Sequence, residues 1–183
     1  MRSLIGNDSF KPHASLSETP IGLELSAAPS ALLFASDLTS VLPQIDALTL
    51  LNISVSKCHD LDQFQTLLDD TSDNRSLVIV ELDGFGGIST VIDRLLSLRL
   101  HRPDLVILLL SSKSRTHDFT TERLALCDVS LMMPCAAADI AAALACAVKN
   151  NAEWQRRVED TESLHYEMAA HLRPAISLPQ FPA

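Results

Sequence analysis

Ser76-Leu-Val-Ile-Val-Glu81-Leu-Asp83-Gly-Phe-Gly-Gly87 is the stretch of sequence that decides the fold. A short, uninterrupted apolar run leads directly into Glu81 and Asp83, and a glycine-rich turn follows. Such a run is typical of a strand that is buried on both faces of a parallel sheet. Open α/β sheets hold their ligands at the carboxyl ends of these strands. We therefore expect Glu81 and Asp83 to lie at the functional edge of a parallel sheet.

The segments on either side of this stretch alternate between short apolar runs and amphipathic helical patterns. Further strands are predicted at residues 31–35, 53–57, 104–110 and 129–133. Helices are predicted at residues 38–51, 60–68 and 88–100, with a weak one at 119–126 and a long alanine-rich one from 136 to 173. Five strands alternating with five helices indicate an α/β fold, a doubly wound five-stranded parallel sheet with an extended C-terminal helix.

The same pattern divides the chain into four parts. Residues 1–29 are rich in Ser and Pro without a regular period, which predicts a mobile N-terminal arm. The sheet domain is expected at residues 30–148 and a C-terminal helical extension at 149–173. Pro174 ends the helical pattern, so residues 174–183 are expected to form a loose tail.

The composition limits the classes of function. Across 183 residues, 14 Lys and Arg face 23 Asp and Glu, and the resulting net charge of −9 disfavours general affinity for nucleic acid or anionic membranes. The spacing of Cys58, Cys127, Cys135 and Cys146 does not match a zinc site, so reduced thiols are expected. Because no apolar stretch is long enough for a secretory signal or a membrane helix, we expect a cytoplasmic protein.

The order and spacing of the elements resemble the receiver domain of two-component response regulators over about residues 30–150. Three features carry the resemblance. A buried strand ends in an acid, Glu81; a later strand ends in a hydroxyl, Ser111; and the last strand is followed by proline, as Met133-Pro134. The resemblance implies a flavodoxin-like, receiver-type sheet.

In that family an aspartate accepts a phosphoryl group, an acid pair holds magnesium, a Ser or Thr contacts the phosphoryl group, and a Lys neutralises it. The matching positions here are Ala35-Ser36 for the acid pair (with Asp37 nearby), Glu81 for the acceptor, Ser111 for the hydroxyl and Met133 for the lysine. Magnesium needs several hard oxygen ligands, and phosphoryl transfer needs its charge offset. The resemblance therefore implies a degenerate pseudo-receiver that works without phosphorylation, metal or cofactor, with Glu81 imitating part of the phosphorylated shape.

Other interpretations of these residues remain open. Shifting the alignment by two positions would make Asp83 the acceptor, and the protein would then be a phosphoacceptor response regulator. Glu81 and Asp83 could act as acid and base in a hydrolase, but no histidine or serine motif accompanies them. The turn at residues 84–87 lacks the spacing of a dinucleotide-binding glycine motif, and Cys58-His59 is more simply structural than nucleophilic.

The C-terminal extension carries both charge and an apolar stripe. Its candidate interface residues are Trp154, Val158, Leu164, Met168 and Leu172. They predict contact with a protein partner, as a homodimeric coiled coil or in a complex with another protein, unless the helix folds back on its own domain. The expected function is a non-enzymatic signalling module. The alternative is a nucleic-acid-binding regulator of the antiterminator type that would use Arg156, Arg157 and Arg173.

Overall fold

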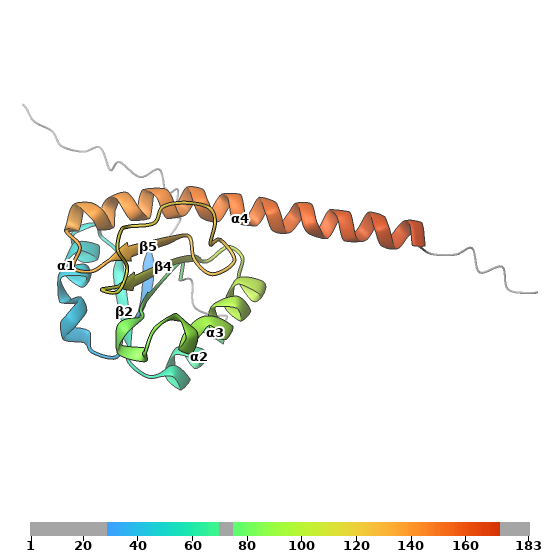
Figure 1. Ribbon diagram of the computed structural model, residues 1–183. Helices are drawn as coiled ribbons and strands as arrows, with labels where there is room; N and C mark the ends of the chain where they lie inside the picture. The colour runs from blue at the N-terminus through green and yellow to red at the C-terminus, as the bar shows by residue number, and fades with distance from the viewer. Residues whose placement is uncertain (1–28, 70–74, 173–183) are drawn as a thin grey trace, which may run out of the picture.

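The computed structural model describes residues 29–69 and 75–172, and an all-parallel sheet of five strands lies at its centre (Figure 1). The strands are β1 (Ser30–Phe34), β2 (Ser54–Cys58), β3 (Leu77–Glu81), β4 (Val106–Ser111) and β5 (Val129–Met132). Their order in the sheet is β2-β1-β3-β4-β5. The chain therefore winds outward in both directions from β1, and the crevice between the ends of β1 and β3 is where such a fold accepts a ligand. The predicted sheet is confirmed.

The central strands are buried because they are apolar on both faces. Every residue of β3 is buried, and so are the last five residues of β4. The register pairs Phe34 with Val80 and Glu81 with Leu110, so the ends of β1, β3 and β4 lie level with one another. β2, at the edge of the sheet, is largely exposed, as its polar residues predict.

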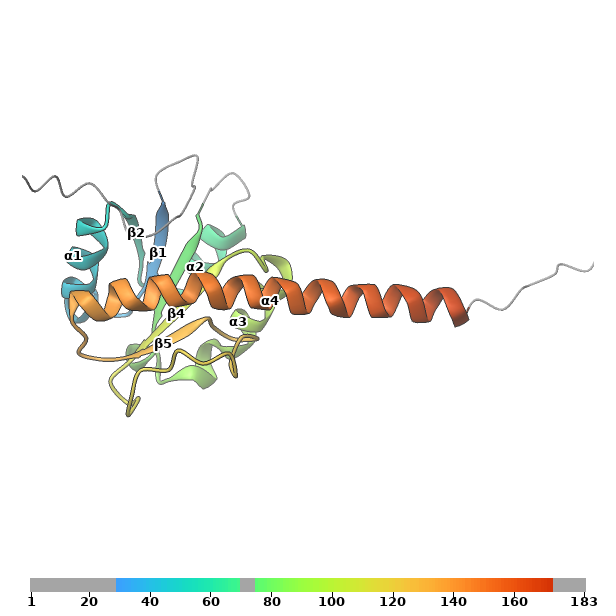
Figure 2. The same cartoon turned by 90° about the horizontal axis from the view of Figure 1, so that it is seen from above.

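Helices cover both faces of the sheet (Figures 1 and 2). They are α1 (Leu42–Leu50), α2 (Leu61–Asp69), α3 (Ile88–His101) and α4 (Ala137–Leu172), with short 3-10 turns η1 (Leu38–Val41) and η2 (Asp83–Phe85). Residues of α1 and α4 pack into the apolar cluster on one face, and residues of α2 and α3 pack into the cluster on the other. The doubly wound architecture is thus confirmed.

The weak helix predicted for residues 119–126 is wrong, because turns connect β4 to β5. Asp118 and Ser130 form an antiparallel bridge, in which the amide of each donates to the carbonyl of the other at 2.8 and 2.9 Å. This bridge holds the connection against the outer edge of β5. Thr120 donates to the Asp118 carboxylate through both its amide and its hydroxyl, which fixes a turn where the helix was expected to begin.

The long C-terminal helix is a single element, and its far end projects from the domain (Figures 1 and 2). Its contacts with the domain continue past residue 149, since Asn150 and Asn151 are buried and Arg157 donates to the Thr121 carbonyl. We call residues 159–172 the projecting part of α4. Residues 1–28 of the predicted arm and residues 173–183, which include the predicted tail, lie outside the described residues. Among the described residues, no helix is both long and apolar enough to cross a membrane.

Candidate functional site

The predicted site residues gather at the carboxyl edge of the sheet. Asp37, Glu81, Asp83 and Met133 line a pocket of about 420 Å³. Ser111, the last residue of β4, lies beside this pocket and is hydrogen-bonded to Asp83. The structure therefore brings all five residues together.

Glu81 ends β3 and turns its side chain back onto the chain that follows. Its Oε1 accepts hydrogen bonds from the amides of Asp83 at 2.7 Å and Gly84 at 3.2 Å. The side chain is 6% exposed, and these two donors compensate the burial of its carboxylate. Glu81 thus closes the turn between β3 and α3.

Gly84 gives the backbone room to pass close to Ser36. A Cβ at Gly84 would overlap Ser36 Oγ and would lie 2.8 Å from Ser36 Cβ and 3.0 Å from Glu81 Oε2. The Ser36 side chain therefore lies directly against the turn beside the Glu81 carboxylate. Ser36 stands at the second position of the family's acid pair, and close packing occupies the space there.

Asp83 bridges two strand ends. Its Oδ1 accepts from the Ser111 hydroxyl at 2.7 Å, and its Oδ2 accepts from the Ser112 amide. Burial alone raises the pKa of Asp83, but the hydrogen bonds from Ser111 and Ser112 and the charge of Lys113 outweigh it and hold the pKa below its ordinary value. The negative charge of Asp83 is thus fixed on the hydroxyl that the receiver resemblance assigns to phosphoryl contact.

Asp37 lies just before η1, the turn that follows β1. Its carboxylate accepts from the Thr39 amide at 2.8 Å and from the Thr39 hydroxyl at 2.7 Å. These hydrogen bonds hold the pKa of Asp37 below its ordinary value. Asp37 is therefore the cap of η1.

The arrangement does not fit the magnesium ion that the receiver fold implies. The carboxylates of Asp37, Glu81 and Asp83 each already accept hydrogen bonds from their own turns or from β4. Within residues 29–69 and 75–172, no group of three or more His, Cys, Asp or Glu side chains is placed to hold a metal ion. Magnesium prefers near-octahedral coordination by several free oxygens, and this donor set does not offer it.

The predicted interface stripe on α4 divides into two parts. Trp154 is half-buried, and its ring lies 5.7 Å from the guanidinium carbon of Arg99, so it packs on its own domain. Val158 is also half-buried, whereas Leu164 is 59% exposed on the projecting part. Met168 and Leu172 belong to the same helix, but their side chains lie outside the described ones.

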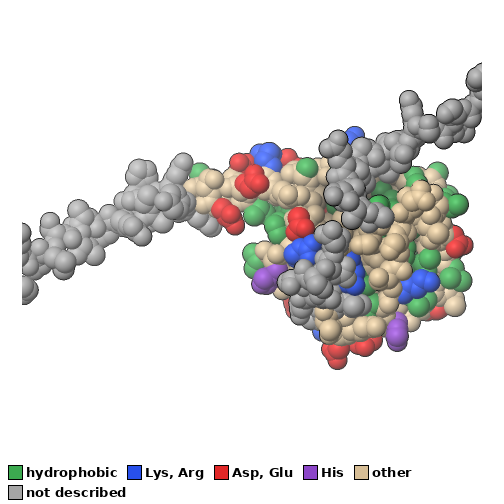
Figure 3. Space-filling view, turned by 180° about the vertical axis from the view of Figure 1, so that it is seen from behind, with side chains coloured by type: hydrophobic (Ala, Val, Ile, Leu, Met, Phe, Trp, Pro, Cys, Tyr) green, Lys and Arg blue, Asp and Glu red, His purple; other side chains and the backbone are tan. Residues whose placement is uncertain are grey.

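The arginines of the nucleic-acid alternative are engaged within α4. Glu153 forms ion pairs with Arg156 at 2.8 Å and with Arg157 at 2.9 Å, and these arginines lower the pKa of Glu153 to about 2. Arg156 also pairs with Asp160 at 2.7 Å. Side chains of both signs thus lie together where α4 leaves the domain (Figure 3). Arg173 lies outside the described residues.

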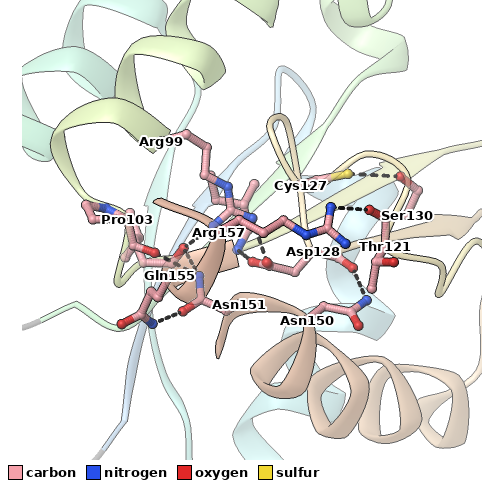
Figure 4. A network of polar contacts seen from close by, with 12 residues as sticks. Arg99, Pro103, Thr121, Cys127, Asp128, Ser130, Asn150, Asn151, Gln155 and Arg157 are labelled. Atoms are coloured by element: carbon pink, nitrogen blue, oxygen red, sulfur yellow. Dashed lines mark hydrogen bonds and ion pairs between the residues drawn. The ribbon is translucent and has the colours of Figure 1, made fainter. Parts of the chain in front are cut away.

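Sequence reasoning missed a buried polar network between α3 and β5 (Figure 4). Arg99 and Asp128 are each 1% exposed and form an ion pair at 2.6 Å. Asp128 Oδ2 also accepts from the Ile107 amide at 2.7 Å, and Arg99 donates to the Leu105 carbonyl at 2.9 Å. An arginine next to Leu98 on the apolar face of α3 was the signal that could have revealed the pair.

Two asparagines of α4 join this network. Asn150 donates to the backbone carbonyl of Asp128 at 2.7 Å, and Asn151 donates to that of Leu105 at 3.0 Å. Asparagine disfavours helix interiors, because its amide competes for backbone hydrogen bonds. The adjacent pair in an alanine-rich helix therefore signalled polar docking. Together these contacts fix α4 against the domain.

Known proteins resemble this chain in structure but not detectably in sequence. No protein-family model matches the sequence, and no curated protein matches it. Solved structures of receiver domains do match. The signal receiver domain of an HD domain-containing protein from Pseudomonas fluorescens Pf-5 is 19% identical, with a TM-score of 0.54 over 69% of this chain and 99% of that chain.

Two further structures extend the likeness. A response regulator from Burkholderia pseudomallei with a phosphorylated aspartic acid, a calcium ion and citrate is 19% identical, with a TM-score of 0.52 over 75% of this chain and 74% of its own. An atypical orphan response regulator, described as having a phosphorylation-independent regulatory mechanism, is 14% identical, with a TM-score of 0.50 over 66% of this chain and 95% of its own. The chain thus has the fold of response-regulator receiver domains, with its predicted site at the edge of the sheet where parallel α/β folds hold their ligands.

Proposed function

We propose that this chain is a non-enzymatic, receiver-like regulatory module that acts through protein contacts without phosphorylation. The contact of Asp83 with Ser111 and Ser112 carries the proposal. In the family that the sequence resembles, a hydroxyl at the place of Ser111 contacts the phosphoryl group. Here the Asp83 carboxylate accepts a hydrogen bond from that hydroxyl, so the site holds a negative charge at neutral pH without phosphorylation.

The residues at this site are poorly suited to phosphoryl transfer. Glu81, at the acceptor position, is buried and hydrogen-bonded to its own turn. Met133 replaces the cation that would offset the charge of a transferred phosphoryl group, and the carboxylates do not form a magnesium site. These residues support a fixed conformation over a phosphorylation switch.

The projecting part of α4 supports self-association as the mode of action. Most of the stability of a helix in a protein comes from packing its apolar face, and residues 159–172 extend α4 beyond the domain. Leu164 is exposed on this part, and its apolar surface gains stability when a partner covers it. We propose a homodimer in which the projecting part supplies the contact.

Incubation of the full chain with acetyl phosphate and magnesium, followed by intact-mass measurement, tests the phosphorylation-independent site. We expect no phosphoryl adduct. The Glu81→Asp variant, which shortens the side chain at the acceptor position, serves as the matched comparison. An adduct on the natural chain that is lost in Asp83→Asn would show that Asp83 accepts phosphate and would overturn the proposal.

A further inference from the structure

Within the described residues 112–128, no helix lies between β4 and β5. α2 and α3 cover one face of the sheet, and turns replace the helix that usually links neighbouring parallel strands between β4 and β5. Beside α3 the structure leaves a pocket of about 530 Å³. Among its lining residues are Ile88, Ile92, Leu109, Leu126, Lys113 and Arg123. The pocket lies between the start of α3 and the β4–β5 connection.

An exposed apolar ridge on α3 continues from this pocket. Ile88 is 36% exposed, Leu96 43% and Leu100 79%, and Ile92 between them is half-buried. The four residues recur at every fourth position, so they form a single ridge of the kind that fits between the ridges of another helix. A contiguous apolar surface of this kind on a soluble protein often marks a site where a partner binds.

The projecting part of α4 matches this surface in length and in charge. α3 has 14 residues, roughly 21 Å at about 1.5 Å per residue, and the projecting part is of similar length. The projecting part contains no Lys or Arg, and Glu159 and Glu162 are exposed on it. The pocket presents Lys113 and Arg123, of which Arg123 also pairs with Asp118 at 3.3 Å. The acidic projecting part and the basic rim of the pocket are thus complementary in charge.

The geometry points to a second copy. Trp154 packs on Arg99, and Asn151 donates to the carbonyls of Pro103 and Leu105, so α4 leaves the domain beside the C-terminal end of α3. From there it runs outward as one helix, away from its own ridge (Figures 1 and 2). A two-fold axis near the projecting part would bring the same helix of another copy back toward Leu100 and Leu96.

We propose that the projecting part of α4 from one copy packs along the α3 ridge and into the adjoining pocket of a second copy, and reciprocally. The helix of the second copy then takes the place of the helix absent between β4 and β5. This inference rests on the self-association proposed above and names the surface that the projecting part binds. A seam between the two α4 helices is the competing arrangement.

Three variants separate these arrangements in size-exclusion chromatography with light scattering. Leu96→Glu damages the ridge, and a chain ending at Val158 removes the projecting part. Leu50→Glu is the matched control, since Leu50 is an exposed leucine at the end of α1. We expect the natural chain and Leu50→Glu to be dimers, and Leu96→Glu to raise the dimer dissociation constant by at least about tenfold.

Mixing Leu96→Glu with the shortened chain is the decisive measurement. One has an intact helix and the other an intact ridge, so the two should form a heterodimer through a single contact at a concentration where each alone is monomeric. If Leu96→Glu stays dimeric and the mixture gives no heterodimer, the α3 ridge is not the surface, and self-association through α4 alone survives. A natural chain that is monomeric at every concentration overturns both proposals. Leu100→Glu repeats the test at a more exposed position if Leu96→Glu does not fold.

Discussion

At the carboxyl edge of the sheet, two acids that lie two residues apart have different roles. Glu81 accepts hydrogen bonds from the turn that follows it, and Asp83 reaches across to Ser111 on the next strand. The division follows from η2, because the 3-10 turn brings position 83 back over the strand ends. A structural acid and a bridging acid therefore occupy what in the receiver family is a single reactive centre.

The bridge made by Asp83 predicts a pH-dependent stability. Because the folded-state pKa is lowered, the ionised carboxylate stabilises the fold fully above the ordinary pKa of 3.8, and this contribution is lost as the pH falls through the lower folded pKa. We expect Asp83→Asn to lower the free energy of unfolding by about 1–2 kcal/mol at pH 7 and by less in acid. Urea denaturation across this pH range measures the difference.

Asp46→Asn provides the control, since Asp46 is an exposed acid of α1. Its substitution should change the free energy of unfolding by at most about 0.5 kcal/mol at either pH. A loss in Asp83→Asn that is the same at pH 7 and in strong acid would show that the charge of Asp83 does not stabilise the bridge.

The sequence predicted the place of the site but not its connections. An apolar run that ends in an acid locates Glu81 at a strand end, because burial on both faces allows few other arrangements. The choice between Glu81 and Asp83 as the partner of Ser111 depends on the backbone path of the turn. Residue types and spacing do not determine that path.

At the scale of elements, the buried pair of Arg99 and Asp128 ties α3 to the segment before β5. The Asp128 carboxylate also holds the amide that begins the buried part of β4. A buried pair of this kind contributes modestly as a whole, because both charges lose their water. Removing only one partner is costly, because it leaves the other charge buried without compensation.

Arg99→Met is therefore expected to lower the free energy of unfolding by about 3–5 kcal/mol. The comparison is Arg102→Met. Arg102 is half-buried, pairs with the exposed Asp104 at 3.0 Å and also donates to the Arg75 carbonyl, and ion pairs that reach solvent contribute about 0–1 kcal/mol. Chemical denaturation of both variants at neutral pH measures the contrast. Equal losses would mean that the buried pair is no more important than the exposed one.

Elements that depend on the residue pattern within their own segment could be predicted, and those that depend on tertiary contacts could not. The strands and the helices α1, α2, α3 and α4 follow from apolar periodicity within each segment, so their existence and order could be predicted. The turns between β4 and β5 depend on the bridge of Asp118 with Ser130, a contact made by tertiary structure. Tertiary contacts also decide that the Trp154 ring packs against Arg99 of its own domain.

At the scale of the whole molecule, the first part of α4 packs on the domain and its last part projects from it. Its first part packs on β4 and β5 and against α1, and the asparagines and Trp154 extend this docking to the end of α3. Beyond Val158 the helix carries exposed side chains through Leu164. A single helix thus runs from the segment after Met133 to the surface proposed for self-association.

Two shortened chains distinguish the docked part of α4 from the projecting part. A chain ending at Val158 keeps Asn150, Asn151 and Trp154, so its domain should unfold at nearly the same urea concentration as the full chain when both are monomeric. A chain ending at Asn150 loses the hydrogen bonds of Asn151 and the packing of Trp154 on Arg99, and it exposes the buried ion pair to water. We expect the second cut to cost at least about 3 kcal/mol, from the lost aromatic burial of Trp154 and the lost hydrogen bonds from Asn151 to the carbonyls of Pro103 and Leu105. Equal stability of the two chains would show that the docked part of α4 ends at Asn150. In that case, loss of a partner from the chain ending at Asn150 would identify a binding surface. If the shorter chain is less stable, the same loss would reflect a damaged domain.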